Sequence, residues 1–150
     1  MLKGRPVNIP AMIRKMKETA EGLGLPFGDG LMTYNSRLAQ ELGLWAQSRG
    51  KGHAFHDAAF RAYFADGKNI AKRPVLLDLT ESAGLPRNEA EEVIQDRQFK
   101  EAVDADWALS REKEIVAIPT FVLNSDRLVG AQSYKKMTAM IEENGVRRSR

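Results

Sequence analysis

Cysteine is absent from this 150-residue chain, and histidine is scarce. Without a thiol, the chain can form no disulfide bond, cysteine-ligated zinc site or iron–sulfur cluster of its own, and it has no cysteine nucleophile. The two histidines, His53 and His56, are too few for an all-histidine metal site. We therefore expect no metal site, and we expect both histidines to lie on a surface helix.

Long apolar runs are also missing. No stretch of about 18 consecutive apolar residues occurs, which is the length that a membrane-spanning helix needs. The first residues, Met1 to Pro6, do not lead into the apolar segment of a secretory signal. Together with the lack of cysteine, these absences predict a cytoplasmic protein without a membrane partner.

Charge of one sign is only slightly in excess. The chain has 23 Lys and Arg against 20 Asp and Glu, a net charge of +3. Much of this excess lies in the last four residues, Arg147 to Arg150, and such a run is typical of a solvated chain end. No helix-turn-helix, zinc-finger or aromatic RNA-binding motif accompanies it. We therefore predict no nucleic-acid partner.

Most of the chain has the pattern of amphipathic helices. Hydrophobic residues make up 43% of the sequence, as in a globular protein of one domain, or of one domain with a small appendage. Apolar residues recur at helical spacing in seven segments. These lie at about residues 10–21, 37–47, 53–65, 74–83, 89–95, 98–112 and 134–144. Asn35 or Ser36 can cap the second helix, Asn88 with Glu91 resembles a capping box for the fifth, and Ser133 can cap the last.

The helical spacing of apolar residues gives way to a strand-like pattern near the C-terminus. Residues 120–123 are rich in strand-forming side chains, residues 124–126 form a turn cluster, and residues 127–129 can return as a second strand. Two strands alone are marginally stable in water, and an unpaired edge invites another strand. The pattern predicts a hairpin that is either covered by helices or completed by another chain.

Several stretches resemble one family. Ile118-Pro119-Thr120-Phe121, a hairpin and then Gly130-Ala131-Gln132 resemble the C-terminal part of the DsbA family, most closely its FrnE-like branch of thioredoxin-fold proteins. Residues 35–39, 60–64 and 84–85 are similar to segments of the same branch, so the resemblance spans roughly residues 35–145.

The resemblance implies an α/β fold of an incomplete thioredoxin-like, DsbA type, dominated by an inserted helical domain and ending in a β-hairpin and a helix. It divides the chain into an N-terminal helix and linker (1–34), the helical insertion domain (35–113) and the C-terminal part of the thioredoxin-like fold (114–150). Residues 1–30 contain no strand followed by Cys-x-x-Cys. The chain therefore looks like a family member that lacks the N-terminal β-α-β unit.

The family also implies a site. The proline that corresponds to Pro119 is cis in the family, and it faces the redox cysteines across a peptide-binding groove. Disulfide exchange requires a thiolate, which this chain does not have, so dithiol oxidoreductase activity by this polypeptide alone is excluded. We expect Ile118, Pro119 and Thr120 to contact an extended peptide or a thiol ligand. No catalytic residue is assigned.

Three alternatives stay open. The hairpin edge near Thr120 to Leu123 could pair with its own copy or with a redox-competent relative, which would make the chain a non-catalytic oligomerising module. Glutathione is a candidate cofactor if the chain is related to glutathione-dependent isomerases or transferases, although these place a serine in the part that is missing here. Finally, Phe55, Phe60, Tyr63 and Phe64 could line a ligand pocket, but aromatic residues at this spacing more often form a helical core.

Overall fold

The computed structural model describes residues 8–29 and 32–146. The chain divides into two compact units, with the boundary between Asp104 and Ala105. Within the described residues, no helix is both long enough and apolar enough to cross a membrane. The basic C-terminal residues 147–150, predicted to be a solvated end, lie outside the described part.

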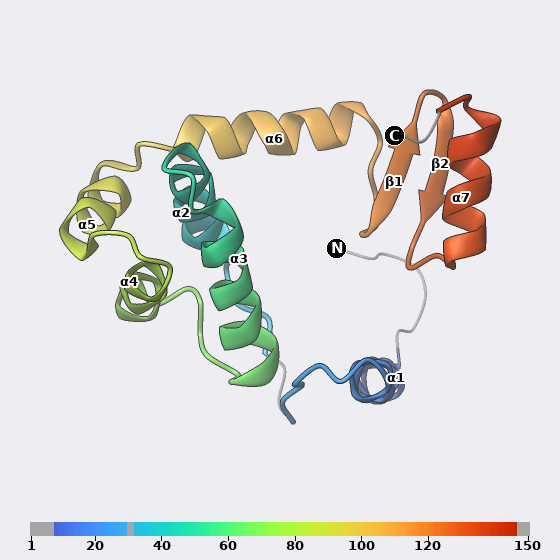
Figure 1. The fold of residues 1–150 in the computed structure, drawn as a ribbon. Coiled ribbons are helices and arrows are strands. Elements are labelled where there is room, and N and C mark those ends of the chain that lie inside the picture. The colour runs from blue at the N-terminus through green and yellow to red at the C-terminus, as the bar shows by residue number, and fades with distance from the viewer. Residues whose placement is uncertain (1–7, 30–31, 147–150) are drawn as a thin grey trace. The chain divides into compact units, whose positions relative to one another are not determined.

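The first unit is helical. Its elements in chain order are α1 (Ile9–Gly22), α2 (Arg37–Ser48), α3 (Gly52–Phe60), the π-helix η1 (Arg61–Ala65), α4 (Arg73–Ser82), α5 (Arg87–Asp96) and the beginning of α6 (Lys100–Glu112), which continues into the second unit. Helix α2 packs against α3, α4 and α5, and α4 also contacts α3 and α5 (Figure 1). The predicted helices are therefore confirmed, with two differences in detail.

The first difference is the predicted third helix, which ends as an α-helix at Phe60 and continues as the π-helix η1. The second is the capping box predicted at Asn88, which is wrong. Helix α5 begins at Arg87, with Pro86 in extended conformation as its N-cap residue and no side-chain cap. Proline leaves the helix start without the side-chain acceptor that an Asn cap would supply.

The core of the first unit forms where the apolar faces of four helices meet. Leu42 of α2 and Leu76 of α4 are fully buried, and Phe55 of α3 and Ile94 of α5 are nearly so. Trp45 lies in the same cluster. Burying one such large side chain stabilises the fold by about 1.5–3 kcal/mol. Helical spacing in the sequence predicts an apolar stripe with Leu42 and Trp45 on α2, with Phe55 on α3 and with Leu76 on α4, and the structure buries these residues.

One carboxylate is buried beside this core. The Glu41 side chain is only 2% exposed. Arg97 donates from Nη2 to Glu41 Oε1 (2.6 Å) and from Nε to Oε2 (2.9 Å), and Arg37 Nε donates to Oε1 at 3.1 Å. Arg37 also reaches Asp104, at 2.6 Å. The hydrogen bonds from Arg97, and then those from Arg37, lower the pKa of Glu41 although burial opposes this. The cluster joins α2 to the end of α5 and the start of α6.

The second unit contains the predicted hairpin. Strands β1 (Thr120–Leu123) and β2 (Asp126–Val129) pair antiparallel, with Thr120 opposite Val129 and Leu123 opposite Asp126. Asn124 in the tight turn has φ 53°, in the left-handed region that asparagine tolerates and that such turns require. In the described part, the sheet has these two strands only.

Helix α7 (Tyr134–Glu143) lies along the hairpin (Figure 1). As predicted, Ser133 caps it, because the Ser133 hydroxyl accepts a bond from the Lys136 amide. At the other end, Asn144 donates to Asp126 Oδ2 at 2.7 Å and accepts from the Asn124 side-chain amide at 2.8 Å. These bonds fasten the end of α7 to the hairpin turn.

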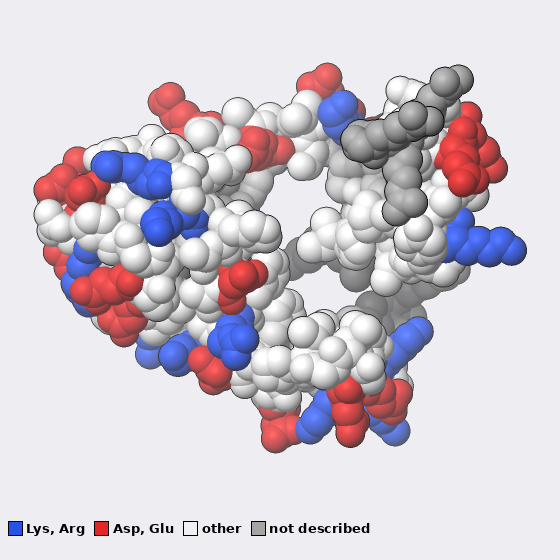
Figure 2. Space-filling view, in the orientation of Figure 1, with Lys and Arg blue, Asp and Glu red and all other residues white. Residues whose placement is uncertain are grey.

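Charged side chains of both signs are mixed over the surface. On the face shown in Figure 2, Lys and Arg lie close to Asp or Glu over the helices, and no continuous basic tract is visible there. Nucleic-acid binding needs a basic tract that follows the phosphate backbone. The absence of a nucleic-acid partner stays a prediction.

Candidate functional site

Of the three predicted site residues, Ile118 and Pro119 lie in the loop that enters β1, and Thr120 is the first residue of that strand. The Ile118–Pro119 peptide bond is cis, and Ile118 is 89% exposed. Two bonds hold the loop on either side of the bend: the Pro119 carbonyl accepts from the Gly130 amide at 2.7 Å, and the Thr120 hydroxyl donates to the Ala117 carbonyl at 2.5 Å. Among the described residues, the N–H and C=O of Ile118 have no hydrogen-bond partner.

A hollow of about 770 Å³ opens beside this loop, between the hairpin and α7. Pro119 and Phe121 line it from the hairpin side, and Tyr134, Met137 and Ile141 line it from α7. We call it the hairpin groove. Exposed backbone groups without partners, next to a mostly apolar groove, can bind a peptide that pairs with them as an added strand does. Of the three predicted residues, Pro119 lines the groove, and Ile118 and Thr120 are its neighbours in the chain.

The hairpin groove has one carboxylate in its wall, Glu142, and no histidine, lysine or arginine among the residues that line it. In the part of the chain that the structure describes, no three His, Asp or Glu side chains converge as metal ligands. His53 and His56 both lie exposed on α3, in the first unit. What the hairpin groove offers is therefore mainly apolar surface and backbone hydrogen bonds, with the exposed Glu142 carboxylate in its wall.

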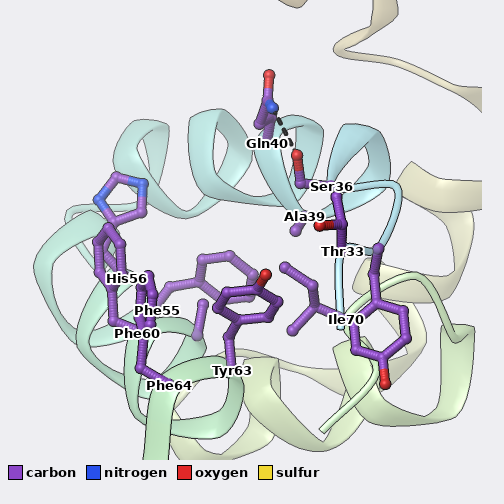
Figure 3. Close-up of a pocket in the computed structure, with 12 residues that line it drawn as sticks. Thr33, Ser36, Ala39, Gln40, Phe55, His56, Phe60, Tyr63, Phe64 and Ile70 are labelled. Carbon is purple, nitrogen blue, oxygen red and sulfur yellow. Dashed lines mark hydrogen bonds between the residues drawn. The ribbon is translucent and has the colours of Figure 1, made fainter. Parts of the chain in front are cut away.

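A second hollow, of about 440 Å³, lies in the first unit between α2, α3 and η1 (Figure 3). Its wall contains Phe55, Phe60, Tyr63 and Phe64, with Ile70 on the other side. We call it the aromatic pocket. The expectation that these aromatic residues form core is correct for Phe55, which is 1% exposed. It is wrong for Phe60, the last residue of α3, which is 62% exposed.

Three polar side chains around the aromatic pocket, Ser36, Gln40 and Tyr63, are already hydrogen-bonded. Gln40 Nε2 donates to the Ser36 hydroxyl at 2.9 Å, the bond drawn in Figure 3. The Tyr63 hydroxyl donates to the Met32 carbonyl at 3.0 Å. No Asp, Glu, Lys or Arg lines the pocket. In the sequence, the signal for this pocket is the set of aromatic residues at positions 60, 63 and 64. On a helix these positions span a wider face than a single buried stripe covers.

One family model matches most of the chain. A model of the DSBA-like thioredoxin domain matches residues 2–142, so the match starts well before the segment 35–145 that carried the resemblance. YwbO, an uncharacterized protein of Bacillus subtilis strain 168, is 27% identical over 88 residues, which are 58% of this chain and 44% of YwbO. The crystal structure of a probable DsbA oxidoreductase from Streptomyces coelicolor is similar with a TM-score of 0.83 and 24% identity, over 93% of this chain and 62% of that one. The chain thus spans less than two thirds of either protein, and the structural likeness establishes the fold alone.

Proposed function

Because this chain belongs to the DSBA-like thioredoxin domain family, as the resemblance predicted, we propose that it binds an extended peptide or a thiol ligand at Ile118, Pro119 and Thr120. Residues 60–64 and 84–85 support placing it in the FrnE-like branch. The observation that carries the proposal is the backbone of Ile118, which has no hydrogen-bond partner among the described residues and lies beside the hairpin groove.

The binding mode follows from what the loop offers. A peptide strand beside Ile118 would donate one N–H to its carbonyl and accept one bond from its amide. An apolar side chain of the peptide would enter the groove between Phe121 and Met137. Two net hydrogen bonds of about 1 kcal/mol each and one buried side chain of about 2 kcal/mol must offset the entropy of association. Binding should therefore be weak, with a dissociation constant of about 1 mM or higher.

The test is an NMR titration of the ¹⁵N-labelled chain with an apolar hexapeptide. We expect amide shifts at residues 118–120 and in α7, and at least threefold weaker binding for Tyr134→Ala, because Tyr134 is 84% exposed and lines the groove. Lys135→Ala is the matched control, since Lys135 is exposed on the same helix turn and does not line the groove. Shifts that avoid residues 118–120, or equal affinity for both variants, would show that the peptide does not bind here.

Reduced glutathione serves as the thiol arm of the same titration. Shifts at residues 118–120 at millimolar glutathione would favour a thiol ligand, and no change in shifts or melting temperature would remove that option. In either case the chain should oxidise a reduced dithiol peptide no faster than buffer does, because it supplies no thiolate. A faster rate from the pure chain would overturn this.

A second candidate function is strand pairing between chains. Within the described residues the sheet has two strands, so the outer edges of both β1 and β2 are unpaired there. Val122 of β1 is 42% exposed, and such an edge favours addition of another strand. Size-exclusion chromatography with light scattering tests it: a dimer or larger species is expected, and a strict monomer at micromolar concentration would rule this out for the chain's own copies.

A further inference from the structure

We propose that the aromatic pocket is a binding site for a flat, uncharged aromatic molecule of two or three fused rings. This inference is independent of the hairpin groove, because every residue of the pocket belongs to the first unit. Three features of the pocket support this proposal: the arrangement of its aromatic rings, the lack of Asp, Glu, Lys and Arg in its wall, and the contacts that hold the Phe64 ring in place.

The rings offer both faces and edges. The Phe60 and Phe64 rings are nearly parallel, with centroids 5.9 Å apart and 14° between planes. Tyr63 meets Phe64 edge to face, at 4.8 Å and 85°. Figure 3 shows the Tyr63 ring reaching into the space between Phe55 and Ile70. Aromatic pairs prefer offset-stacked and edge-to-face contacts, so a further flat ring gains more from this wall than an aliphatic group of equal area.

The wall selects against charge and against peptide. None of the lining residues is Asp, Glu, Lys or Arg, and His56 is the only lining side chain that can carry a positive charge, so a charged ligand would lose its hydration with little opposite charge to replace it. A peptide needs unpaired polar partners, whereas Gln40 and the Tyr63 hydroxyl already have partners. The volume of about 440 Å³ lies within the range of small-molecule sites, about 300–1,000 Å³. A neutral ligand can still place one hydroxyl or carbonyl near Thr33 or His56.

The Phe64 ring belongs to the π-helix η1, and contacts of this segment hold it in place. In η1 the Asp66 amide bonds to the Arg61 carbonyl, and the Phe64 carbonyl accepts from the Gly28 amide at 2.7 Å. The Phe27 ring stacks on the Phe64 ring, with the centroids 6.2 Å apart and 27° between the planes. Phe64 is thus held between the segment before α2 and the pocket. π-helical turns occur frequently at functional sites, and a preformed wall lowers the cost of binding.

The experiment uses 2-naphthol as the neutral probe and 2-naphthalenesulfonate as its charged counterpart. We expect the full chain to bind 2-naphthol, with amide shifts on α3 and η1, and to bind the sulfonate at least tenfold more weakly. Phe60→Ala should weaken 2-naphthol binding at least fivefold. The fold should survive, because Phe60 is largely exposed. Leu109→Ala is the control, since Leu109 is exposed on α6 and lines none of the described pockets.

A second variant fills the space instead of opening it. Ala59→Leu places extra carbon atoms in the pocket from α3 and should abolish binding, while circular dichroism verifies that the helices are intact. The proposal is overturned if 2-naphthol does not bind, if its shifts fall on residues 116–141, if the sulfonate binds equally well, or if both pocket variants bind as tightly as Leu109→Ala.

Discussion

The buried carboxylate of Glu41 gives the sharpest test of the forces in the helical unit. Glu41→Gln keeps the shape of the side chain but removes its charge and points an N–H₂ group at arginine donors. Breaking a buried ion pair costs about 3–5 kcal/mol. Here the cost should be lower, because the Arg97 side chain is 40% exposed and can regain water. We expect a loss of about 2 kcal/mol in the free energy of unfolding, within the range for hydrogen bonds to charged groups.

The assay is urea unfolding, followed by circular dichroism and by the fluorescence of Trp45, which lies in the same core. With a slope of about 1.5 kcal/mol per molar, a loss of about 2 kcal/mol lowers the midpoint by about 1.3 M urea. Glu91→Gln is the matched control, because Glu91 is 58% exposed and 3.8 Å from Arg87, so it should cost less than about 0.5 kcal/mol. If Glu41→Gln also costs less than about 0.5 kcal/mol, the carboxylate does not hold the helices together as we argue.

The same carboxylate gives the stability a pH dependence with a definite sign. Hydrogen bonds from Arg97 and Arg37 hold the pKa of Glu41 below its value in the unfolded chain. The folded state therefore binds this proton less readily. The resulting stability is fully present above the usual glutamate pKa and is lost as pH falls through the lower, folded-state pKa. We expect the urea midpoint of unfolding to decrease as the pH is lowered from 6 into the acid range. The decrease should be steeper for the wild type than for Glu41→Gln, and urea titrations at a series of pH values measure it. Equal slopes would contradict the assignment.

Two further substitutions test the backbone contacts. Gly28→Ala should destabilise the first unit by about 1–3 kcal/mol in urea, because the new Cβ would lie 2.6 Å from the Ala65 carbonyl oxygen. Gly22→Ala, where nothing lies within 4 Å, should be neutral or stabilising, and equal effects would refute the reasoning. Asn144→Ala should destabilise the second unit by about 1 kcal/mol, because it removes the bond to Asp126, and hydrogen exchange in α7 should accelerate. Unchanged exchange would show that this bond does not fasten the helix.

Much of the fold follows from spacing that is visible in the sequence. The apolar stripe containing Leu42 and Trp45 identified the buried face of α2, and Ser133 marked the start of α7. The change from helical spacing to a run of strand-forming residues with a turn cluster located the hairpin. These signals are local, so one sequence is enough to detect them. The capping of α5 was misassigned because Asn88 and Pro86 both suit a helix start, and propensity alone does not choose between them.

The contacts that hold distant segments together left no such signal. Glu41 and Arg97 are 56 positions apart, and nothing in the pattern around either residue predicts their pairing. The bond from Gly28 to Phe64 depends on η1, and the sequence from 61 to 65 is compatible with an ordinary α-helix. The Pro119 loop was predicted only through resemblance to a family. The spacing of the aromatic residues around the aromatic pocket predicts a helical core. Which of these rings is covered depends on how the helices cross, and a single sequence does not show that.

The two hollows differ in the chemistry that each can satisfy, and this makes their independence testable. The hairpin groove adjoins the Ile118 backbone, whose polar groups lack partners among the described residues, whereas Gln40 and the Tyr63 hydroxyl beside the aromatic pocket have theirs. A peptide gains backbone hydrogen bonds mainly at the first, and a flat neutral ring gains aromatic contacts mainly at the second. Because each hollow is built within one unit, we expect saturating 2-naphthol to leave the peptide affinity unchanged in the NMR titration. Mutual displacement would mean that both ligands occupy one surface, and the assignment of two sites would then be wrong.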